Sequence, residues 1–460
     1  MARLLIVSNR VALPGEQAAR AGGLAIAVRE ALRRFGGLWI GWSGETAERA
    51  GNDLSIATTG RISVATLDLT AREHELYYSG FSNSVLWPLC HYRLGLMDFR
   101  RDFYTGYLEV NERFAAAIAS VVQPDDLIWV HDYHFLPLAA ALRRRGIGNR
   151  VGFFLHIPFP APEVLKVVPF HEQLVADMCQ YDLLGFQTEG DARAFRDFIV
   201  HEAGGAVGAD GAVDAFGQRT RTGVFPVGID TDRFAQTAAA TERGPEALRL
   251  AASLAGRRLV IGVDRLDYSK GLALRFDAYS RLLANHPEQR GQVVMMQIAP
   301  TSRSEVRQYR ALRRELEQIA GRINGRYAEF DWEPLRYLNR GFTRNTLAGF
   351  YHQSRVGLVT PLRDGMNLVA KEFVAAQDPE NPGVLVLSRF AGAAAELGDG
   401  AKLVNPYDVE GVGEALHEAL VMPVEERQER HGAMIRVLRN NTVSHWYERF
   451  LTELREAPDR

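Results

Sequence analysis

The sequence has few cysteines and lacks any long uninterrupted apolar run. Its 460 residues include only two cysteines, Cys90 and Cys179, which are too few for a disulfide framework or a cysteine-rich metal site. No stretch reaches the ~18 apolar residues that a membrane-spanning helix needs, and the N-terminus lacks the pattern of a secretory signal. These absences predict a cytoplasmic protein that does not act at a membrane.

An excess of charge of one sign is also missing. Lys and Arg together number 54 and Asp and Glu 56, which gives a formal net charge of -2. No whole-protein field would therefore attract nucleic acid or an anionic membrane, and we expect neither as a partner. Lysine is scarce, so a lysine inside a motif is of particular interest. The four are Lys166, Lys270, Lys371 and Lys402.

Short β-branched runs alternate with segments of helical period along the chain. This alternation predicts an α/β fold whose parallel sheets are covered by helices on both faces, and we expect two doubly wound, Rossmann-like domains at 1–228 and 229–440. The expected strands are 4–8, 127–131, 151–156, 183–187, 222–227, 259–263, 293–298, 356–360 and 384–388. The expected helices are 23–35, 136–145, 191–202, 272–284, 304–319 and 367–376.

Two segments fall outside this alternation. Residues 203–218 are rich in glycine and predict a mobile loop or the tip of a hairpin. Residues 441–455 predict a helix, with Asn441 or Thr442 as its N-cap, and we expect the C-terminal part at about 441–460 to pack back on the first domain. One face of this helix is apolar and is formed by Val443, Trp446, Phe450, Leu451 and Leu454.

Several common enzyme motifs do not occur. The sequence contains no G-x-G-x-x-G, no G-x-x-x-x-G-K-[ST] and no G-x-S-x-G, which argues against dinucleotide oxidoreductases, P-loop kinases and ordinary serine esterases. Asp230-Thr231-Asp232 matches a D-x-D pattern that could hold a divalent metal. Such tripeptides arise often by chance, and this one follows the end of an expected strand.

A cationic segment follows the expected strand 259–263. Residues 264–272 read DRLDYSKGL and open a helix, so Arg265, Lys270 and a helix N-terminus converge on one place. Backbone amides and two cations in that arrangement suit a diphosphate.

A second segment repeats this arrangement after the expected strand 356–360. Gly365 permits a tight turn, and the amides of residues 366–368 would begin a helix that points at an anion. Asp364 could accept a sugar hydroxyl, and Glu372, one helical turn further on, could accept both hydroxyls of a ribose.

Polar residues also follow two expected strands of the first domain, where open α/β sheets bind ligands. Asp132, in the segment HDYH, could accept a sugar hydroxyl or act as a base. His131 and His134 would suggest zinc only with a third ligand, and they could equally pack the loop. His156 lies in FLHIPFP, where two prolines would hold it in place.

A further anion site is suggested by Arg10, which follows the first expected strand, together with Tyr78 and Arg303. Trp42 and Trp87 could stack on the face of a sugar, although tryptophan is as often a core residue.

Ten segments, in this order and spacing, resemble the trehalose-6-phosphate synthase family of retaining glycosyltransferases. They are SNR, AGGL, GWSGE, FSN-x-VLWP, HDYH, FLHIPFP, GFQTE, DRLDYSKG, QIAPTSR and RDGMNLVAKE. The resemblance runs from Arg3 to about Trp446. It implies the GT-B fold, in which two Rossmann-like domains face a deep cleft.

The resemblance also implies a reaction and its residues. UDP-glucose would donate glucose to glucose 6-phosphate with retention, giving α,α-trehalose 6-phosphate and UDP, with no cofactor and no obligatory metal, in a homo-oligomer (a dimer or tetramer). The donor would meet Gly22, Gly23, Arg265, Lys270, Phe342, Asp364, Gly365, Met366, Asn367, Leu368, Val369 and Glu372. The acceptor would meet Arg10, Trp42, Tyr78, Trp87, Asp132 and Arg303. The catalytic residues would be Asp132, His156, Arg265 and Lys270.

Two alternatives stay open at this point. The same fold could use ADP-glucose or GDP-glucose, or another phosphorylated acceptor such as glycerol 3-phosphate. An inactive sugar-phosphate sensor is a different class of protein, and it should have lost one or more of the polar residues implied above. None of these residues is lost.

Overall fold

A computed structural model describes residues 3–11, 23–49, 51–301 and 307–457, and the chain divides into two compact units. The first unit contains the described residues up to Pro226 together with those from Ser444 onward, and the second unit contains Val227–Val443. Within the described ranges, no helix combines the length and the apolar character that crossing a membrane requires.

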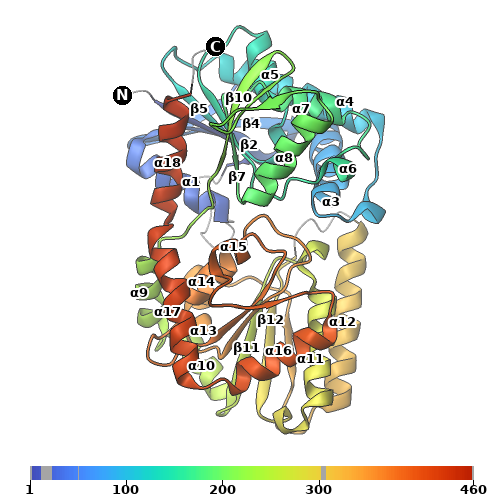
Figure 1. Ribbon diagram of the computed structural model, residues 1–460, viewed down its shortest axis with the longest axis vertical. Helices are drawn as coiled ribbons and strands as arrows, with labels where there is room; N and C mark the ends of the chain where they lie inside the picture. Colours follow the sequence, from blue (N-terminus) through green and yellow to red (C-terminus); the bar gives the residue numbers. More distant parts are fainter. Residues whose placement is uncertain (1–2, 12–22, 50, 302–306, 458–460) are drawn as a thin grey trace. The chain divides into compact units, whose positions relative to one another are not determined.

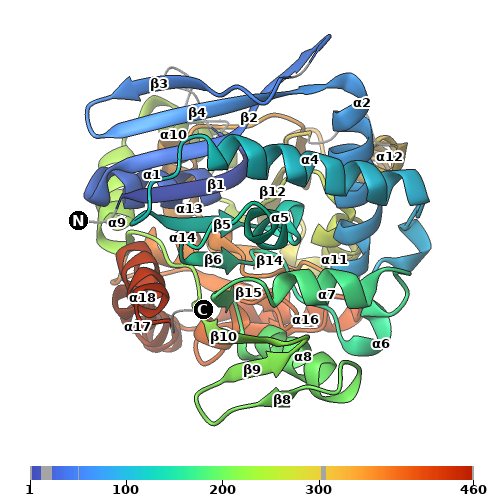
Figure 2. The same cartoon turned by 90° about the horizontal axis from the view of Figure 1, so that it is seen from above.

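The first unit is built on a mixed sheet. Among the described residues this sheet has ten strands in the order β3-β4-β2-β1-β5-β6-β7-β10-β9-β8; Figure 2 labels all of them except β7, which is labelled in Figure 1. Its centre is parallel, and antiparallel pairs close both edges. The strands are β1 (Leu4–Arg10), β2 (Gly37–Ala47), β3 (Ser55–Thr59), β4 (Ile62–Thr70), β5 (Leu127–His131), β6 (Val151–Phe154), β7 (Leu183–Phe186), β8 (Ala206–Val207), β9 (Ala212–Ala215) and β10 (Gln218–Val224).

Local sequence explains where several elements of the first unit begin. Strand β5 is buried along its whole length, as expected for an apolar run inside a parallel sheet. Helix α8 begins after Thr188, whose side chain accepts a hydrogen bond from the Asp191 amide. The helices are α1 (Gly23–Phe35), α2 (Ala71–Glu73), the π-helix η2 (His74–Leu86), α3 (Trp87–Cys90), η3 (Leu94–Leu96), α4 (Arg101–Ala119), η4 (Tyr133–Phe135), α5 (Leu138–Arg144), α6 (Pro162–Leu165), α7 (His171–Met178), α8 (Glu189–His201) and α18 (Val443–Arg455).

Helix α18 packs against the sheet of the first unit, although more than 200 residues of the second unit separate it from that sheet in sequence. The Phe450 ring stacks on Trp129 of β5 with ring centroids 4.8 Å apart. Strands β6 and β7 each have a glycine beneath this ring, because a Cβ atom on Gly152 or Gly185 would come within 2.8 or 2.7 Å of Phe450. All five apolar residues expected on one face of this helix are buried.

The second unit is built on an all-parallel sheet. In its described part the sheet has six strands in the order β13-β12-β11-β14-β15-β16, and Figure 1 shows β11 and β12 in this unit. This order is the doubly wound arrangement of dinucleotide-binding folds. The strands are β11 (Arg258–Val263), β12 (Val293–Ile298), β13 (Leu335–Leu338), β14 (Val356–Val359), β15 (Val384–Ser388) and β16 (Lys402–Val404).

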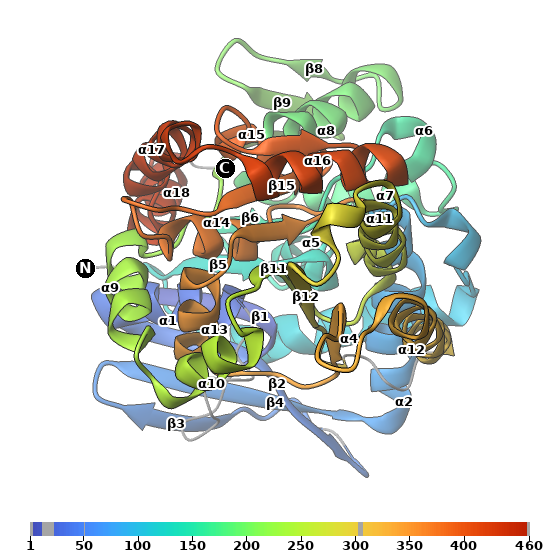
Figure 3. The ribbon, with the colours of Figure 1, turned by 90° about the horizontal axis from the view of Figure 1, so that it is seen from below.

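Helices cover both faces of this second sheet. Helix α11 contacts both α12 and α16 on one side, and α9, α10, α13, α14 and α17 form a connected group on the other; Figure 3 shows the two groups apart. The bounds are α9 (Thr231–Thr241), α10 (Pro245–Leu254), η5 (Tyr268–Lys270), α11 (Leu272–Asn285), η6 (Pro287–Gln289), α12 (Arg307–Tyr327), α13 (Arg344–His352), α14 (Leu368–Ala375), α15 (Ala394–Leu397), α16 (Val409–Val421) and α17 (Val424–Asn440).

Each sheet has one topological switch point, the place where the strand order reverses and the connections leave two neighbouring strands in opposite directions. In the first unit this place lies between β1 and β5, and in the second unit it lies between β11 and β14. Connections leave these neighbouring strands in opposite directions, which opens a crevice at their carboxyl ends where ligands bind. Most of the polar residues singled out from the sequence follow one of these strands or their neighbours β6 and β12.

The expected strands and helices are confirmed, with small changes at their ends. The glycine-rich segment 203–218 contributes β8, β9 and the start of β10, so of the two expected forms it takes that of a hairpin. Strands β2, β3 and β4 were not expected and extend the first sheet. Helix α12 continues to Tyr327, beyond its expected end at 319.

Candidate active site

The loop after β11 is held in shape by Asp267. This carboxylate accepts hydrogen bonds from the Ser269 amide at 2.9 Å and from the Tyr309 hydroxyl at 3.0 Å. The Asp267 carbonyl oxygen accepts one from the Lys270 amide at 3.1 Å. These bonds close the short helical turn η5 and place Lys270 directly before α11, with Gly271 between them in a left-handed conformation (φ +67°).

Lys270 reaches the loop that follows β14. Its Nζ atom lies 2.5 Å from Asp364 Oδ2, and the same oxygen accepts a hydrogen bond from Asn367 Nδ2 at 3.1 Å. The Lys270 side chain is 11% exposed and that of Asp364 15%. Two strands that neighbour each other in the sheet therefore deliver a cation and a carboxylate to one place, as the sequence predicts for the donor site.

The turn before α14 has an unusual backbone. Asn367 adopts φ +98°, and its side chain caps the helix by accepting a hydrogen bond from the Ala370 amide at 3.1 Å. A non-glycine residue in such a conformation costs about 1–3 kcal/mol, and strain of this kind concentrates at functional sites. The backbone of Gly365 in this turn packs closely on Gly392. A Cβ atom on Gly392 would lie 1.8 Å from the carbonyl oxygen of Gly365. Met366, Leu368 and Val369 complete the turn and the start of α14.

Glu372 is placed one turn further along α14. Its Oε1 accepts a hydrogen bond from Arg344 Nε at 2.9 Å. Burial raises the pKa of the Glu372 carboxyl, and the neighbouring Arg344 guanidinium opposes that rise. Phe342, also assigned to the donor, packs edge-to-face on Phe350 with ring centroids 5.4 Å apart. Arg344 thus orients the carboxylate and favours its charged form.

Arg275 is a positioning residue that the sequence did not reveal. Its side chain is fully buried and donates to Asp264 Oδ2 at 2.6 Å, to Gln297 Oε1 at 2.9 Å and to Thr360 Oγ1 at 2.9 Å. These three partners lie at the ends of β12 and just after β11 and β14, so one guanidinium ties together the three strand ends that carry the site. Arg275 lies within a helix and is one of 50 arginines, so no local pattern marks it.

The remaining donor residues of the sequence prediction are placed as follows. Arg265 is exposed on the loop after β11. Gly23 is the first residue of α1, in the first unit. Gly22 and the acceptor residue Arg303 lie outside the described residues.

In the first unit, Asp132 follows β5 in a conformation that is rare for a non-glycine residue. It adopts φ +75° and ψ 165°, a strained region that marks functional positions. Its amide donates to the Phe154 carbonyl at 2.8 Å, and its Oδ1 accepts from the His156 amide at 3.3 Å. The ends of β5 and β6 therefore hold Asp132 and His156 side by side.

His156 forms a pair with a second histidine. Its Nε2 lies 3.1 Å from Nδ1 of His131, and the Trp446 ring of α18 packs against both imidazoles with centroids 6.1 Å away. Burial lowers the pKa of His156 to about 3. Burial, and then the neighbouring His156, lower the pKa of His131 well below its ordinary value. Both rings are therefore neutral near pH 7, and one donates to the other.

We expect this pair to make the stability of the first unit depend on pH. In the unfolded chain His156 titrates near its ordinary pKa of 6.5, so between pH 6.5 and 3 the unfolded chain binds a proton that the folded chain does not. The contribution of the neutral pair to the free energy of unfolding is fully present above pH 6.5. It is lost as the pH falls, by about 1.4 kcal/mol per pH unit for each such histidine. Urea unfolding at pH about 7 and about 5 measures this slope.

The matched variants are His156→Asn and His201→Asn. The first should flatten the slope, because it removes one of the two protonation events. The second replaces an exposed histidine at the end of α8 and should leave the slope unchanged. An identical slope in wild type and His156→Asn would contradict the neutral pair.

The other acceptor residues lie on or beside the π-helix η2. The rings of Trp42 and Tyr78 both pack on His74, with centroids 4.9 and 5.1 Å from it, and lie 6.0 Å from each other. Tyr78 also stacks on His134 at 5.9 Å. π-Helical segments are rare and occur often at functional sites. The structure thus brings Tyr78 and Trp42 together in one aromatic group.

Trp87 and Arg10 occupy neighbouring parts of the first unit. Trp87 is buried and packs on Tyr133 with centroids 5.8 Å apart, and Tyr133 directly follows Asp132. Arg10 is exposed at the end of β1, and its guanidinium lies against Gly44, where a Cβ atom would come within 2.9 Å of its nitrogens.

The two metal hypotheses raised by the sequence find no support. Asp230 caps α9 by accepting from the Arg233 amide at 3.2 Å, and Asp232 accepts from Arg439 Nε at 3.0 Å. In the part of the chain that the structure describes, His131 and His134 are not joined by a third ligand.

The second unit is a doubly wound fold with a cation, an oriented carboxylate and a helix N-terminus at its switch point, and the first unit carries polar and aromatic groups at its own. Two such units in one chain are typical of GT-B glycosyltransferases, and the solved structures described below share this fold. The profile of glycosyltransferase family 20 matches residues 5–456. The chain belongs to this family.

Known proteins of this family are similar along their whole length. The trehalose-6-phosphate synthase of Cronobacter sakazakii is 50% identical over all of this chain and 96% of its own. An α,α-trehalose-phosphate synthase (UDP-forming) from Burkholderia xenovorans, solved in complex with glucose-6-phosphate, has a TM-score of 0.95 at 50% identity and covers 99% of this chain and 100% of its own. An E. coli structure bound with UDP-2-fluoro glucose has a TM-score of 0.95 at 48% identity and covers 100% of both chains.

Proposed function

We propose that this chain is a retaining glucosyltransferase that transfers glucose from UDP-glucose to glucose 6-phosphate, giving α,α-trehalose 6-phosphate and UDP. The observation that carries the proposal is the convergence of Lys270, Asp364 and the start of α14 at the switch point of the second unit. The complexes of related proteins with glucose-6-phosphate and with UDP-2-fluoro glucose support the choice of substrates.

The donor is assigned to the second unit. Lys270 and Arg265 would neutralise the diphosphate, together with the backbone amides at the start of α14. Asp364, oriented by Asn367, would accept hydroxyls of the donor glucose, and Glu372, oriented by Arg344, would accept those of the ribose. Phe342 would border the base.

The acceptor is assigned to residues of the first unit and to Arg303. Arg10, Tyr78 and Arg303 would bind its phosphate, because a guanidinium forms strong charge-assisted hydrogen bonds with phosphate oxygens. Trp42, Trp87 and Asp132 would contact the sugar. Asp132 has a backbone fixed by the Phe154 carbonyl, so its carboxylate is oriented before the sugar binds.

The proposed chemical step is a front-face displacement. The acceptor O1 forms a bond to the anomeric carbon on the side from which the diphosphate leaves, the bond between that carbon and the phosphate oxygen breaks, and the O1 proton passes to the leaving oxygen. The protein contributes positioning and cationic stabilisation of the leaving group. His156 would sit beside the anomeric carbon, and its neutral ring adds no positive charge where positive charge develops.

Three further statements belong to this proposal. The reaction needs no metal, the enzyme works in the cytoplasm, and it self-associates. All three are expectations from the sequence and its family resemblance.

The deciding experiment measures UDP release from UDP-glucose in EDTA, with and without glucose 6-phosphate. We expect UDP release that depends on the acceptor and that is at least about 100-fold slower in the Lys270→Ala variant. ADP-glucose, GDP-glucose and glycerol 3-phosphate are the comparison substrates.

Faster turnover with one of the comparison substrates would overturn the assigned donor or acceptor. No turnover with any donor and acceptor pair, with or without added Mg²⁺, would overturn the assignment as a transferase. The inactive sugar-phosphate sensor would then be the remaining alternative. Turnover only with Mg²⁺ would overturn the metal-independent step.

A further inference from the structure

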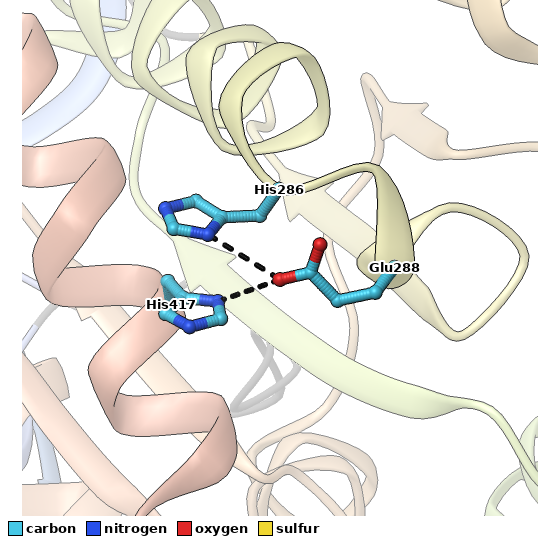
Figure 4. Close-up of side chains that lie close together, drawn as sticks. All are labelled: His286, Glu288 and His417. Atoms are coloured by element: carbon cyan, nitrogen blue, oxygen red, sulfur yellow. Dashed lines mark ion pairs between the residues drawn. The ribbon is translucent and has the colours of Figure 1, made fainter.

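A histidine and glutamate cluster lies in the second unit, on elements that the proposed reaction does not use (Figure 4). His286 directly follows α11 as its C-cap, Glu288 lies in η6, and His417 lies on α16. One ligand atom from each side chain falls within 4.8 Å of the others. The two imidazole rings stack in parallel, with centroids 3.7 Å apart and 10° between their planes.

Two carboxylates face the His286 ring from opposite sides. His286 Nε2 lies 3.0 Å from both carboxylate oxygens of Glu414. With Glu414 at Nε2, the other ring nitrogen, Nδ1, is the one that faces Glu288, at 3.4 Å from its Oε1.

His417 faces the same carboxylate. Its Nδ1 lies 3.7 Å from Glu288 Oε1, and Figure 4 shows both histidine contacts meeting at one carboxylate oxygen. The amide nitrogen of Gln289 lies 3.3 Å from the same Nδ1, so a metal ion bound there would take the place of that contact. Two imidazole nitrogens and a carboxylate oxygen thus converge from three elements on one place.

We propose that this cluster is a binding site for a divalent transition-metal ion of the Zn²⁺ class, held by Nδ1 of His286, Nδ1 of His417 and Oε1 of Glu288. Two nitrogens and one carboxylate oxygen are a ligand set that Zn²⁺ accepts, whereas Mg²⁺ requires oxygen ligands. Glu414 supplies the carboxylate that commonly orients a metal-bound histidine from behind. Water completes the coordination, because Glu288 is 59% exposed.

The site would fasten helix α11 to helix α16. Helix α11 has 14 residues and begins two positions after Lys270, so about 21 Å of helix separates the metal from that lysine. The metal is therefore structural. It should stabilise the second unit, while the transfer reaction proceeds in EDTA, so this inference and the proposed function fail independently.

The test is a calorimetric titration of Zn²⁺ into the full-length chain, without an affinity tag and after treatment with EDTA. We expect one Zn²⁺ per chain, at least about 100-fold weaker binding in His286→Gln/His417→Gln, and a 10- to 100-fold loss in Glu414→Gln, whose residue orients a ligand. The matched control is His201→Gln, an exposed histidine of the first unit, which should bind as wild type does. Co²⁺ in place of Zn²⁺ should give visible absorption bands in wild type and none in the double variant.

Thermal unfolding provides the second readout. Zn²⁺ should raise the Tm of wild type and leave that of the double variant unchanged, since only a ligand that binds the folded state stabilises it. Glu288→Gln keeps the measurement interpretable if the double variant does not fold, because its side chain is mostly exposed and should lose affinity without loss of fold. Absence of stoichiometric Zn²⁺ binding in wild type, equal binding in Glu288→Gln, or an equal rise in Tm with Mg²⁺ would overturn the proposal.

Discussion

Replacing Lys270 with alanine is expected to lower kcat by about 100-fold or more, the effect of removing one electrostatic stabiliser from an active site. The lysine is mostly buried and already fixed in place by Asp364 at 2.5 Å, so its charge is preorganised for a leaving diphosphate. A group that binds the transition state more tightly than the substrate lowers kcat when it is removed, whereas uniform binding affects only KM. Steady-state rates of UDP release at varied UDP-glucose measure both constants.

The matched control is Lys402→Ala. Lys402 belongs to the same unit and pairs with Glu418 near the surface, where ion pairs contribute little. It should turn over like wild type. Turnover of Lys270→Ala close to the wild-type rate, or a change confined to KM, would contradict the assigned role.

Arg265→Ala, which removes the second cation of this loop, should also lower kcat by about 100-fold.

Replacing Lys371 with methionine is expected to destabilise the second unit by about 3–5 kcal/mol. The Lys371 side chain is fully buried, and its Nζ contacts Glu396 at 2.5 Å and donates to the Val227 carbonyl at 2.8 Å. Burial lowers the pKa of Lys371, and Glu396 opposes that shift. Methionine fills a similar volume but leaves the Glu396 carboxylate buried without a cation, which is the costly half of a broken buried pair. Urea unfolding followed by far-UV circular dichroism measures the loss.

Two further variants separate the charge from the shape. Lys371→Met/Glu396→Gln removes both charges, so it should recover part of the loss, because the amide no longer carries a buried charge. Lys402→Met breaks an exposed pair and should cost about 1 kcal/mol or less. If Lys371→Met and Lys402→Met were equally stable, the buried pair would not contribute as described.

The parts of the fold that were predictable are those that a local pattern specifies. The spacing of Trp446, Phe450 and Leu454 reveals one face of helix α18, and all three are buried. The central strands are equally visible, since each is a short apolar run bounded by polar residues. The loops after these strands were also predictable, because sheet topology places the carboxyl ends of parallel strands along one edge.

The parts that were missed lack such a pattern. Strand β3 is exposed along its whole length, so no apolar alternation marks it. The π-helix η2 does not follow the 3.6-residue period by which helices are recognised. Arg275 and Lys371 find partners up to 85 and 144 residues away in sequence. Pairings at such separations are decided by tertiary packing. The roles of the donor and acceptor residues stay predictions until variants are measured.

The place of helix α18 bears on the order in which the protein is assembled during synthesis. Domains usually fold as units, N-terminal first, while the ribosome is still extending the chain. Here the sheet of the first unit must wait, because Trp446 and Phe450, which cover Trp129, are translated after every residue of the second unit. The described residues of the second unit are continuous in sequence, so this unit can close first. The nascent first half therefore exposes an aromatic surface for most of translation, and this surface is where a chaperone would engage it.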